Sequence, residues 1–153
     1  MSEPAVDIAL VAGLTFHHLG VACAKIDDEI GVWTALGYRA EGVDFVDVAQ
    51  GVRGLFMVGG GPRIELLEAI GGSDTLAPWL KRGVKIYHLG YIAASLSEAI
   101  AAFEAKGATL ARAPTPSVYF KSRIAFLLMP NLTLIELIET PSDTLHTPPG
   151  ATT

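Results

Sequence analysis

The feature that most constrains this chain is a segment that it contains twice. Residues 16–21 (FHHLGV) recur at residues 86–91 (IYHLGY), so that His18 and His88 lie 70 residues apart. Several further pairs of identical or similar residues keep the same offset, including Gly37 with Gly107 and Phe56 with Phe126. A repeat at a fixed spacing is the signature of a supersecondary unit used more than once. The chain is therefore predicted to use one such unit twice.

Each copy also carries a glutamate inside an apolar strand pattern. Residues 64–68 (IELLE) recur as residues 135–139 (IELIE), so a histidine near the start and a glutamate near the end occur in both copies. A carboxylate in an apolar strand is costly to bury without a partner. Two imidazoles and two carboxylates related by a pseudo-two-fold repeat would form a site for a divalent first-row metal ion. The predicted metal ligands are His18, Glu65, His88 and Glu136.

Strand alternation separates these four residues from similar neighbours. Successive side chains on a strand point to opposite faces, so His17 is predicted to face away from His18. By the same parity, Glu68 and Glu139 are predicted to face away from Glu65 and Glu136. We therefore leave His17, Glu68 and Glu139 out of the predicted site.

Composition and charge exclude several classes of function. With 153 residues, half of them hydrophobic, the chain suits one domain whose core the two copies share. Its net charge is −5 and its basic residues are scattered, which argues against nucleic-acid binding. No apolar run approaches the roughly 18 residues that a membrane span requires. The only cysteine, Cys23, excludes an intrachain disulfide and indicates the reducing cytoplasm.

Periodicity and turn residues predict a β-α-β-β-β order for each copy. In the first copy, strands are expected at residues 14–23, 38–48 with an interruption at 41–42, 51–58 and 63–69, and the helix runs from Ile26 towards Gly37. In the second copy, strands are expected around His88 and at residues 109–113, 123–129 and 132–138, with a helix capped by Ser95. A short helix at residues 76–81, capped by Ser73 or Asp74, is expected between the copies.

The predicted domain layout follows from these elements. Residues 1–13 form an N-terminal arm, either an edge strand or a segment packed on a partner. Residues 14–140 form a single domain, with a first module at about 14–70, a linker at 71–83 and a second module at about 84–140. Residues 141–153, rich in Pro, Thr and Gly, are expected to form a flexible tail.

The paired His-Leu-Gly and Ile-Glu-Leu motifs resemble those of the vicinal oxygen chelate superfamily, which includes glyoxalase I, extradiol dioxygenases and resistance proteins. Within it, residues 50–53 (QGVR), 63–68 (RIELLE) and 73–80 (SDTLAPWL) are most similar to the methylmalonyl-CoA epimerase branch. The resemblance implies an α+β fold in which two βαβββ modules form a partly open mixed barrel of about eight strands. It also implies one divalent metal ion (Co, Ni, Zn, Mn or Mg) and a homodimer.

The resemblance further implies a reaction. In that superfamily the metal stabilises negative charge on a substrate oxygen while a base moves a proton from the adjacent carbon. Similar epimerases carry a catalytic glutamate directly before the Gln-Gly-Val run, where this chain has Ala49. Asp47, two residues earlier, is the candidate replacement. Glu136 is a second candidate base that would also bind the metal.

Basic and aromatic residues indicate an anionic, partly apolar small-molecule substrate such as an acyl-CoA. Lys121, Arg123 and Tyr87 are the candidate substrate-binding residues. The expected function is a metal-dependent isomerase, epimerase or glyoxalase-type lyase. A non-catalytic binding module of the same fold and an extradiol-type dioxygenase remain alternatives. The identity of the metal and substrate, and whether the modules pair within or between chains, stay open at this point.

Overall fold

The computed structural model describes residues 13–141, from the turn before the first strand to two residues after the last one. Residues 1–12 of the predicted arm and residues 142–153 of the predicted tail lie outside this range. The described chain divides into two compact units, which are taken separately below. The first unit contains residues 17–90, and the second contains residues 13–16 and 91–141. Strands β1 (Leu14–Cys23) and β6 (Ile86–Ala93) contribute residues to both units.

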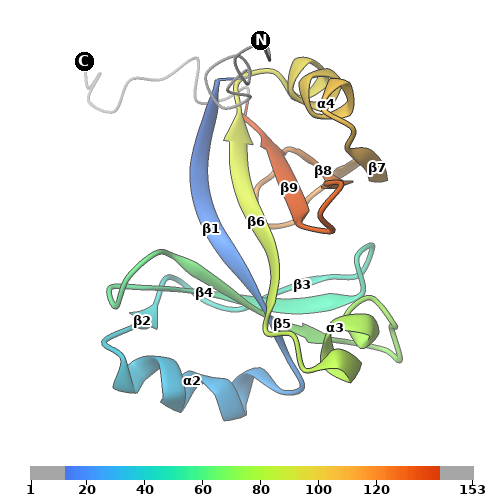
Figure 1. The fold of residues 1–153 in the computed structure, drawn as a ribbon. Coiled ribbons are helices and arrows are strands. Elements are labelled where there is room, and N and C mark those ends of the chain that lie inside the picture. The colour runs from blue at the N-terminus through green and yellow to red at the C-terminus, as the bar shows by residue number, and fades with distance from the viewer. Residues whose placement is uncertain (1–12, 142–153) are drawn as a thin grey trace, which may run out of the picture. The chain divides into compact units, whose positions relative to one another are not determined.

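The first unit contains most of the first copy of the repeat. After β1 come helix α2 (Ile26–Ala35), the short strands β2 (Arg39–Ala40) and β3 (Phe45–Asp47), the longer strands β4 (Val52–Val58) and β5 (Ile64–Ala69), and helix α3 (Ala77–Arg82). The hydrogen-bonded strand order is β2-β4-β5-β1-β6, and β3 pairs with β4. Figure 1 shows helix α2 running along one side of this set of strands.

Pairing between β1 and β5 sets the register of the first unit. The two strands are parallel, and Gly20 lies opposite Glu65. Strands β4 and β5 are antiparallel, and Phe56 lies opposite the same glutamate. Apolar side chains from β1, β4, β5 and the start of α2 form the core, including Val21, Ile26, Met57 and Leu66. Burying these side chains is the main favourable contribution to folding of the unit.

The second unit contains the rest of the second copy. Helix α4 (Leu96–Ala105) is followed by strands β7 (Thr109–Pro116), β8 (Arg123–Leu128) and β9 (Leu134–Glu139). The strand order is β6-β9-β8-β7, in which β8 is antiparallel to both of its neighbours. Phe126 lies opposite Glu136, as Phe56 lies opposite Glu65 in the first unit. The repeat in the sequence is thus a repeat in strand register.

The predicted fold class is confirmed. Each copy follows the βαβββ order when the short strands β2 and β3 are counted as one interrupted strand. The sheet is mixed, and β2 and β7 are the end strands of an open order. The predicted cap of α4 is also confirmed, because the Ser95 hydroxyl accepts a hydrogen bond from the Glu98 backbone N–H at 3.3 Å. No helix within residues 13–141 is long and apolar enough to span a membrane.

The predicted cap of the linker helix was wrong. Helix α3 begins one residue after Leu76, which makes no side-chain cap hydrogen bond. The hydroxyl of Ser73 instead accepts from the backbone N–H of Thr75 at 3.2 Å. Serine hydroxyls form such local turns readily, and here that bond competes with capping.

Candidate metal centre

Three of the four predicted metal ligands meet within the first unit. The Nε2 atoms of His18 and His88 lie 2.9 Å apart, and each lies 3.3 Å from Oε1 of Glu65. All three side chains are buried, with exposed fractions of 0%, 2% and 4% for His18, His88 and Glu65. Strands β1, β6 and β5 each supply one donor atom to this cluster.

The donor atoms are spaced as they would be around a metal ion. Imidazole nitrogens and carboxylate oxygens bind divalent ions such as zinc at about 2.0–2.2 Å, which separates neighbouring donors by about 3 Å. The observed separations of 2.9 and 3.3 Å fit this spacing. Two imidazoles and a carboxylate also suit several first-row divalent metals. The residues present therefore fit a divalent metal ion.

The glycine of each His-Leu-Gly motif makes room for the histidine of the other copy. A Cβ added to Gly20 would lie 2.3 Å from Cε1 of His88, and a Cβ added to Gly90 would lie 2.3 Å from Cε1 of His18. Any side chain larger than hydrogen would therefore collide with the opposite imidazole. The repeated motif has a steric explanation that sequence reasoning missed, although the glycine two residues after each histidine was visible.

Aromatic packing fixes the ring of His18. Its ring is perpendicular to that of Phe56, with centroids 5.1 Å apart, and also perpendicular to that of His88 at 5.0 Å. Phe56 is fully buried and stacks in turn on Phe45 at 6.0 Å. Edge-to-face contacts of this kind stabilise one ring orientation over others. The imidazole is therefore held in place before any ligand binds.

The electrostatics of Glu65 also suit a cation. Burial by itself raises the pKa of a carboxyl group, but the charge of His18 and hydrogen bonds from His18 and His88 outweigh it and lower the pKa of Glu65. A fully buried carboxylate stays ionised only when positive charge or donors compensate it. Imidazolium can supply that charge, and so can a divalent metal ion.

His17 contacts the site, contrary to the expectation from strand alternation. Its Nδ1 lies 2.8 Å from Nδ1 of His18, and its ring is perpendicular to that of His18, with centroids 5.1 Å apart. Burial, followed by the charges of His18 and Arg63, lowers the pKa of His17 to about 4. The double histidine was the available signal, but the simple parity rule assigned His17 to the opposite face.

Glu136, the fourth predicted ligand, lies on β9 in the second unit. It is buried, with 3% of its surface exposed, and the strand around it is otherwise apolar. Its register position opposite Phe126 matches that of Glu65 opposite Phe56. The role of Glu136 as a ligand stays a prediction that rests on the repeat, and its role as a base stays one that rests on the family resemblance.

Asp47, the other predicted base, caps a turn. It is buried, with 1% exposed, and its two carboxylate oxygens accept from the backbone N–H of Gln50 at 3.1 Å and from Nε2 of Gln50 at 2.9 Å. The repeat-related residue Ser117 does the same in the second unit, where its hydroxyl accepts from the N–H of Phe120 at 3.3 Å. A capping role accounts for the burial of Asp47, and a role in proton transfer stays a prediction.

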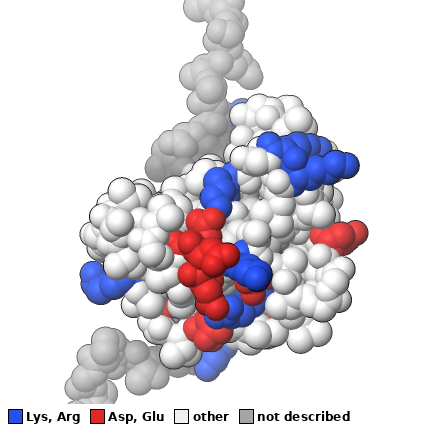
Figure 2. Space-filling model, turned by 90° about the horizontal axis from the view of Figure 1, so that it is seen from below, with Lys and Arg blue, Asp and Glu red and all other residues white. Residues whose placement is uncertain are grey.

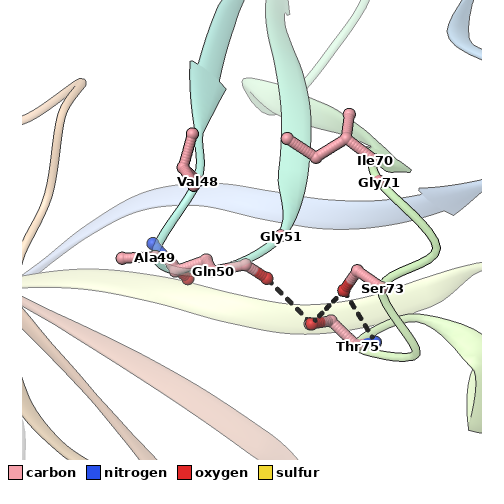
Figure 3. A pocket seen from close by; sticks show the side chains of 8 residues that line it. All are labelled: Val48, Ala49, Gln50, Gly51, Ile70, Gly71, Ser73 and Thr75. Carbon is pink, nitrogen blue, oxygen red and sulfur yellow. Dashed lines mark hydrogen bonds between the residues drawn. The ribbon is translucent and has the colours of Figure 1, made fainter.

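A cavity of about 310 Å³ lies beside this turn in the first unit. Figure 3 shows Ala49 and Gln50 on one side of it, and Ser73 and Thr75 on the other. Thr75 donates to the carbonyl of Gln50 at 2.8 Å, which ties the turn to the linker. The lining residues are Val48, Ala49, Gln50, Gly51, Ile70, Gly71, Ser73 and Thr75, and the metal-donor residues are not among them.

The three candidate substrate-binding residues differ in their surroundings. Tyr87 is buried in the first unit and packs edge-on against Trp79 and His88, with centroids 4.5 and 4.8 Å apart. In the second unit, Lys121 is exposed, whereas Arg123 forms an ion pair with Glu139 through contacts of 3.2 and 2.5 Å. Binding of an anionic substrate by Arg123 would compete with this pair. Their role in substrate binding stays a prediction.

Acidic and basic side chains are mixed on the surface in Figure 2. In the first unit, the guanidinium of Arg53 lies 2.8 Å from Asp44 and 3.5 Å from both Asp27 and Glu68. Lys85 is likewise paired with Glu29. On this surface of the first unit, the charges of Arg53 and Lys85 are therefore already matched by carboxylates.

Comparisons with known proteins agree with this architecture. A profile of the Glyoxalase/Bleomycin resistance protein/Dioxygenase superfamily matches residues 17–126. A search of curated proteins found no match.

Several solved structures are similar in fold. A hypothetical protein from Bacillus halodurans C-125 has a TM-score of 0.71 and 24% identity, over 84% of this chain and 96% of that one. Methylmalonyl-CoA epimerase from Mycobacterium tuberculosis has a TM-score of 0.70 and 24% identity, over 86% and 91%. A Streptomyces coelicolor methylmalonyl-CoA epimerase variant in complex with 2-nitronate-propionyl-CoA has a TM-score of 0.68 and 24% identity, over 84% and 95%.

Proposed function

Because the chain belongs to the Glyoxalase/Bleomycin resistance protein/Dioxygenase superfamily, we propose that it is a metal-dependent enzyme that removes a proton from a carbon next to a carbonyl group. The observation that carries the proposal is the buried cluster of His18, His88 and Glu65, whose donor atoms lie 2.9–3.3 Å apart. The reaction class is that of an isomerase or epimerase, or of a glyoxalase-type lyase.

The chain's own residues have distinct parts in this proposal. His18, Glu65 and His88 hold the metal, and Glu136 is its fourth ligand by analogy between the two copies. A bound divalent ion stabilises negative charge developing on a carbonyl oxygen, which makes the adjacent proton removable near neutral pH.

Proton transfer requires a base, and an epimerase requires a group on each side of the carbon. Glu136 and Asp47 are the two candidates. Each carboxylate oxygen of Asp47 already accepts a hydrogen bond from Gln50, so this side chain has a structural role in the turn that is independent of proton transfer. We therefore assign the principal role to Glu136 and treat Asp47 as the second group.

An acyl-CoA is the proposed substrate class. Structural neighbours with TM-scores near 0.7 include methylmalonyl-CoA epimerases, one of them in complex with 2-nitronate-propionyl-CoA. Lys121, Arg123 and Tyr87 would contact its charged and apolar parts. A homodimer and a cytoplasmic location remain predictions that accompany this proposal.

A non-catalytic binding module is the second candidate function. It is favoured by the turn at Asp47 and Gln50, where Ala49 stands in place of the epimerases' glutamate and both Asp47 oxygens are already hydrogen-bonded. Such a protein would bind a metal ion or a small molecule without catalysing proton transfer. An extradiol-type dioxygenase is less consistent with Glu65 and Glu136 both acting as ligands, because that chemistry needs coordination positions left open.

Metal content is the primary test. Protein purified without a metal-affinity tag is dialysed against Co²⁺, Ni²⁺, Zn²⁺ or Mn²⁺, and metal per chain is measured by plasma mass spectrometry. We expect about one ion per chain in the wild type. His88→Ala is expected to lose the ion and keep its circular dichroism spectrum, since removing a ligand deletes one donor from the set. Equal metal content in this variant would overturn the assignment.

The reaction itself is tested by solvent deuterium uptake at the α-carbon of a panel of acyl-CoAs. Uptake by metal-loaded wild type that is absent from His88→Ala supports the enzyme. Saturable binding of an acyl-CoA without uptake favours the binding module instead.

A further inference from the structure

We propose that His17 is a positioning residue that holds His18 in the tautomer able to bind a metal ion through Nε2. The proposal rests on the metal centre described under the proposed function, and it adds a residue outside the predicted ligand set. Its basis is the contact of 2.8 Å between Nδ1 of His17 and Nδ1 of His18.

The two ring nitrogens of His18 face different partners. Nε2 points to the donor cluster, 2.9 Å from Nε2 of His88 and 3.3 Å from Oε1 of Glu65, whereas Nδ1 faces His17. A neutral imidazole carries one ring proton, so a lone pair on Nε2 requires the proton to be on Nδ1. That N–H then donates to Nδ1 of His17, which is within hydrogen-bond distance.

The acceptor is itself held in place within the first unit. The ring of His17 packs perpendicular to that of Phe56, with centroids 5.7 Å apart. Its backbone carbonyl accepts from Nη1 of Arg63 at 3.2 Å, and Arg63 is anchored by two contacts to Glu41 at 3.0 and 3.2 Å. A metal-binding histidine commonly donates its second N–H to a fixed acceptor, which sets both tautomer and ring orientation. The acceptor in this chain is a second imidazole.

The second copy orients its histidine with a different residue. Tyr87 occupies the place of His17, and its ring packs edge-on against His88 with centroids 4.8 Å apart. Tyrosine has no ring nitrogen, so the arrangement made by His17 cannot occur at this position. The inferred hydrogen bond is therefore specific to the first copy.

Two substitutions at His17 separate hydrogen bonding from packing. His17→Phe keeps the aromatic ring against Phe56 but removes the acceptor, whereas the Oδ1 atom of Asn in His17→Asn can take the place of Nδ1. Dissociation constants for Co²⁺ are measured by competition titration of each purified variant. We expect His17→Phe to bind Co²⁺ about 10- to 100-fold more weakly than wild type, and His17→Asn to recover most of the affinity.

A second readout follows the proton directly. In ¹⁵N-labelled, Zn²⁺-loaded wild type, we expect the Nδ1 proton of His18 to give a protected, low-field NMR signal. The signal should persist in His17→Asn and exchange rapidly with solvent in His17→Phe. This measurement does not depend on turnover.

The outcomes distinguish the two proposals. Wild-type protein that binds neither Co²⁺ nor Zn²⁺ overturns the metal centre and, with it, the role of His17. Wild-type binding with unchanged affinity in His17→Phe overturns the role of His17 alone. Equal weakening of Co²⁺ binding in His17→Phe and His17→Asn also overturns it, because His17 would then contribute through packing. A His18 ring proton found on Nε2 overturns it as well, because His18 would then be in the other tautomer.

Discussion

The two copies of the His-Leu-Gly motif are alike where they face each other and different one residue away. The imidazole ring of each histidine packs against the glycine of the other motif. Its Cε1 atom lies 2.3 Å from a Cβ added to that glycine, in both copies. Before these histidines, however, the first copy has a hydrogen-bonding imidazole and the second an aromatic ring packed on Trp79. The shared part brings the two histidines together, and the differing part gives each histidine its own neighbour.

The same contrast extends to the turns before strands β4 and β8. Asp47 accepts two hydrogen bonds from Gln50, whereas Ser117 accepts one from Phe120. Both turns are capped by a buried polar side chain, but only the first is capped by a carboxylate. The two copies therefore share the position of the cap and differ in its charge.

The largest expected effect comes from removing the shared feature. Gly20→Ala and Gly90→Ala each place a methyl group 2.3 Å from the opposite imidazole. We expect each variant to lose about 1–3 kcal/mol of unfolding free energy through overpacking. Because a donor ring is displaced, metal affinity should also fall at least about tenfold.

Urea unfolding and Co²⁺ titration measure these two effects. Gly31→Ala is the matched control, since no atom lies within 4 Å of its added Cβ and alanine favours helix α2. If Gly20→Ala and Gly31→Ala bound Co²⁺ equally well, the absence of a side chain at Gly20 would not be required for the position of the His88 ring.

An intermediate effect is expected from making the two turns alike. Asp47→Ser copies the cap of the second unit, losing the bond to the Gln50 side chain and keeping a hydroxyl acceptor for its N–H. We expect unfolding free energy to fall by about 1–2 kcal/mol, as measured by urea unfolding. Metal content should not change.

Deuterium uptake by the same variant tests the catalytic role of Asp47. A carboxylate that moves a proton contributes about 10²-fold or more to rate. Uptake reduced by this factor, with metal retained, would assign proton transfer to Asp47. Uptake near the wild-type level would leave Asp47 as a turn cap and Glu136 as the base.

The smallest effect concerns the helix starts. Ser95 caps α4, whereas the repeat-related residue Lys25 at the start of α2 makes no side-chain cap hydrogen bond. Ser95→Ala is expected to cost about 1 kcal/mol of unfolding free energy, and Lys25→Ser to gain roughly 0.5 kcal/mol. Thermal unfolding of both variants measures the difference. A loss of stability in Lys25→Ser would show that its hydroxyl does not accept from the backbone N–H of Asp28, the position equivalent to Glu98 in helix α4.

Sequence alone predicted the strands and the βαβββ order, because the apolar pattern of residues such as Ile64, Leu66 and Leu67 is set by burial. The superfamily was predicted from the resemblance of the paired His-Leu-Gly and Ile-Glu-Leu motifs to those of its members. The sequence also paired His18 with His88, and Glu65 with Glu136, at equivalent points of the repeat. It could not predict the contact of His17 with His18. Strand parity gives the direction of each Cα–Cβ bond, but it does not give the position of the imidazole ring at the end of the side chain.

Local competition between hydrogen bonds was also hidden from the sequence. Ser73 and Asp74 both suit a helix start, yet Ser73 bonds to Thr75 and the helix begins after Leu76. Likewise, nothing in the pattern around Asp47 indicates that Gln50 bonds to both of its oxygens. Such choices depend on the positions of several atoms at once, which periodicity does not specify.

The contact between the two His-Leu-Gly motifs has a consequence for folding kinetics. The donor cluster joins residues separated by 70 positions, so closing that loop carries an entropic cost before any contact is gained. Contacts this distant in sequence generally slow folding. Neither motif can form the cluster alone, and metal added during refolding should stabilise the product without accelerating the early steps. Metal uptake would then report the moment at which β1 and β6 come together.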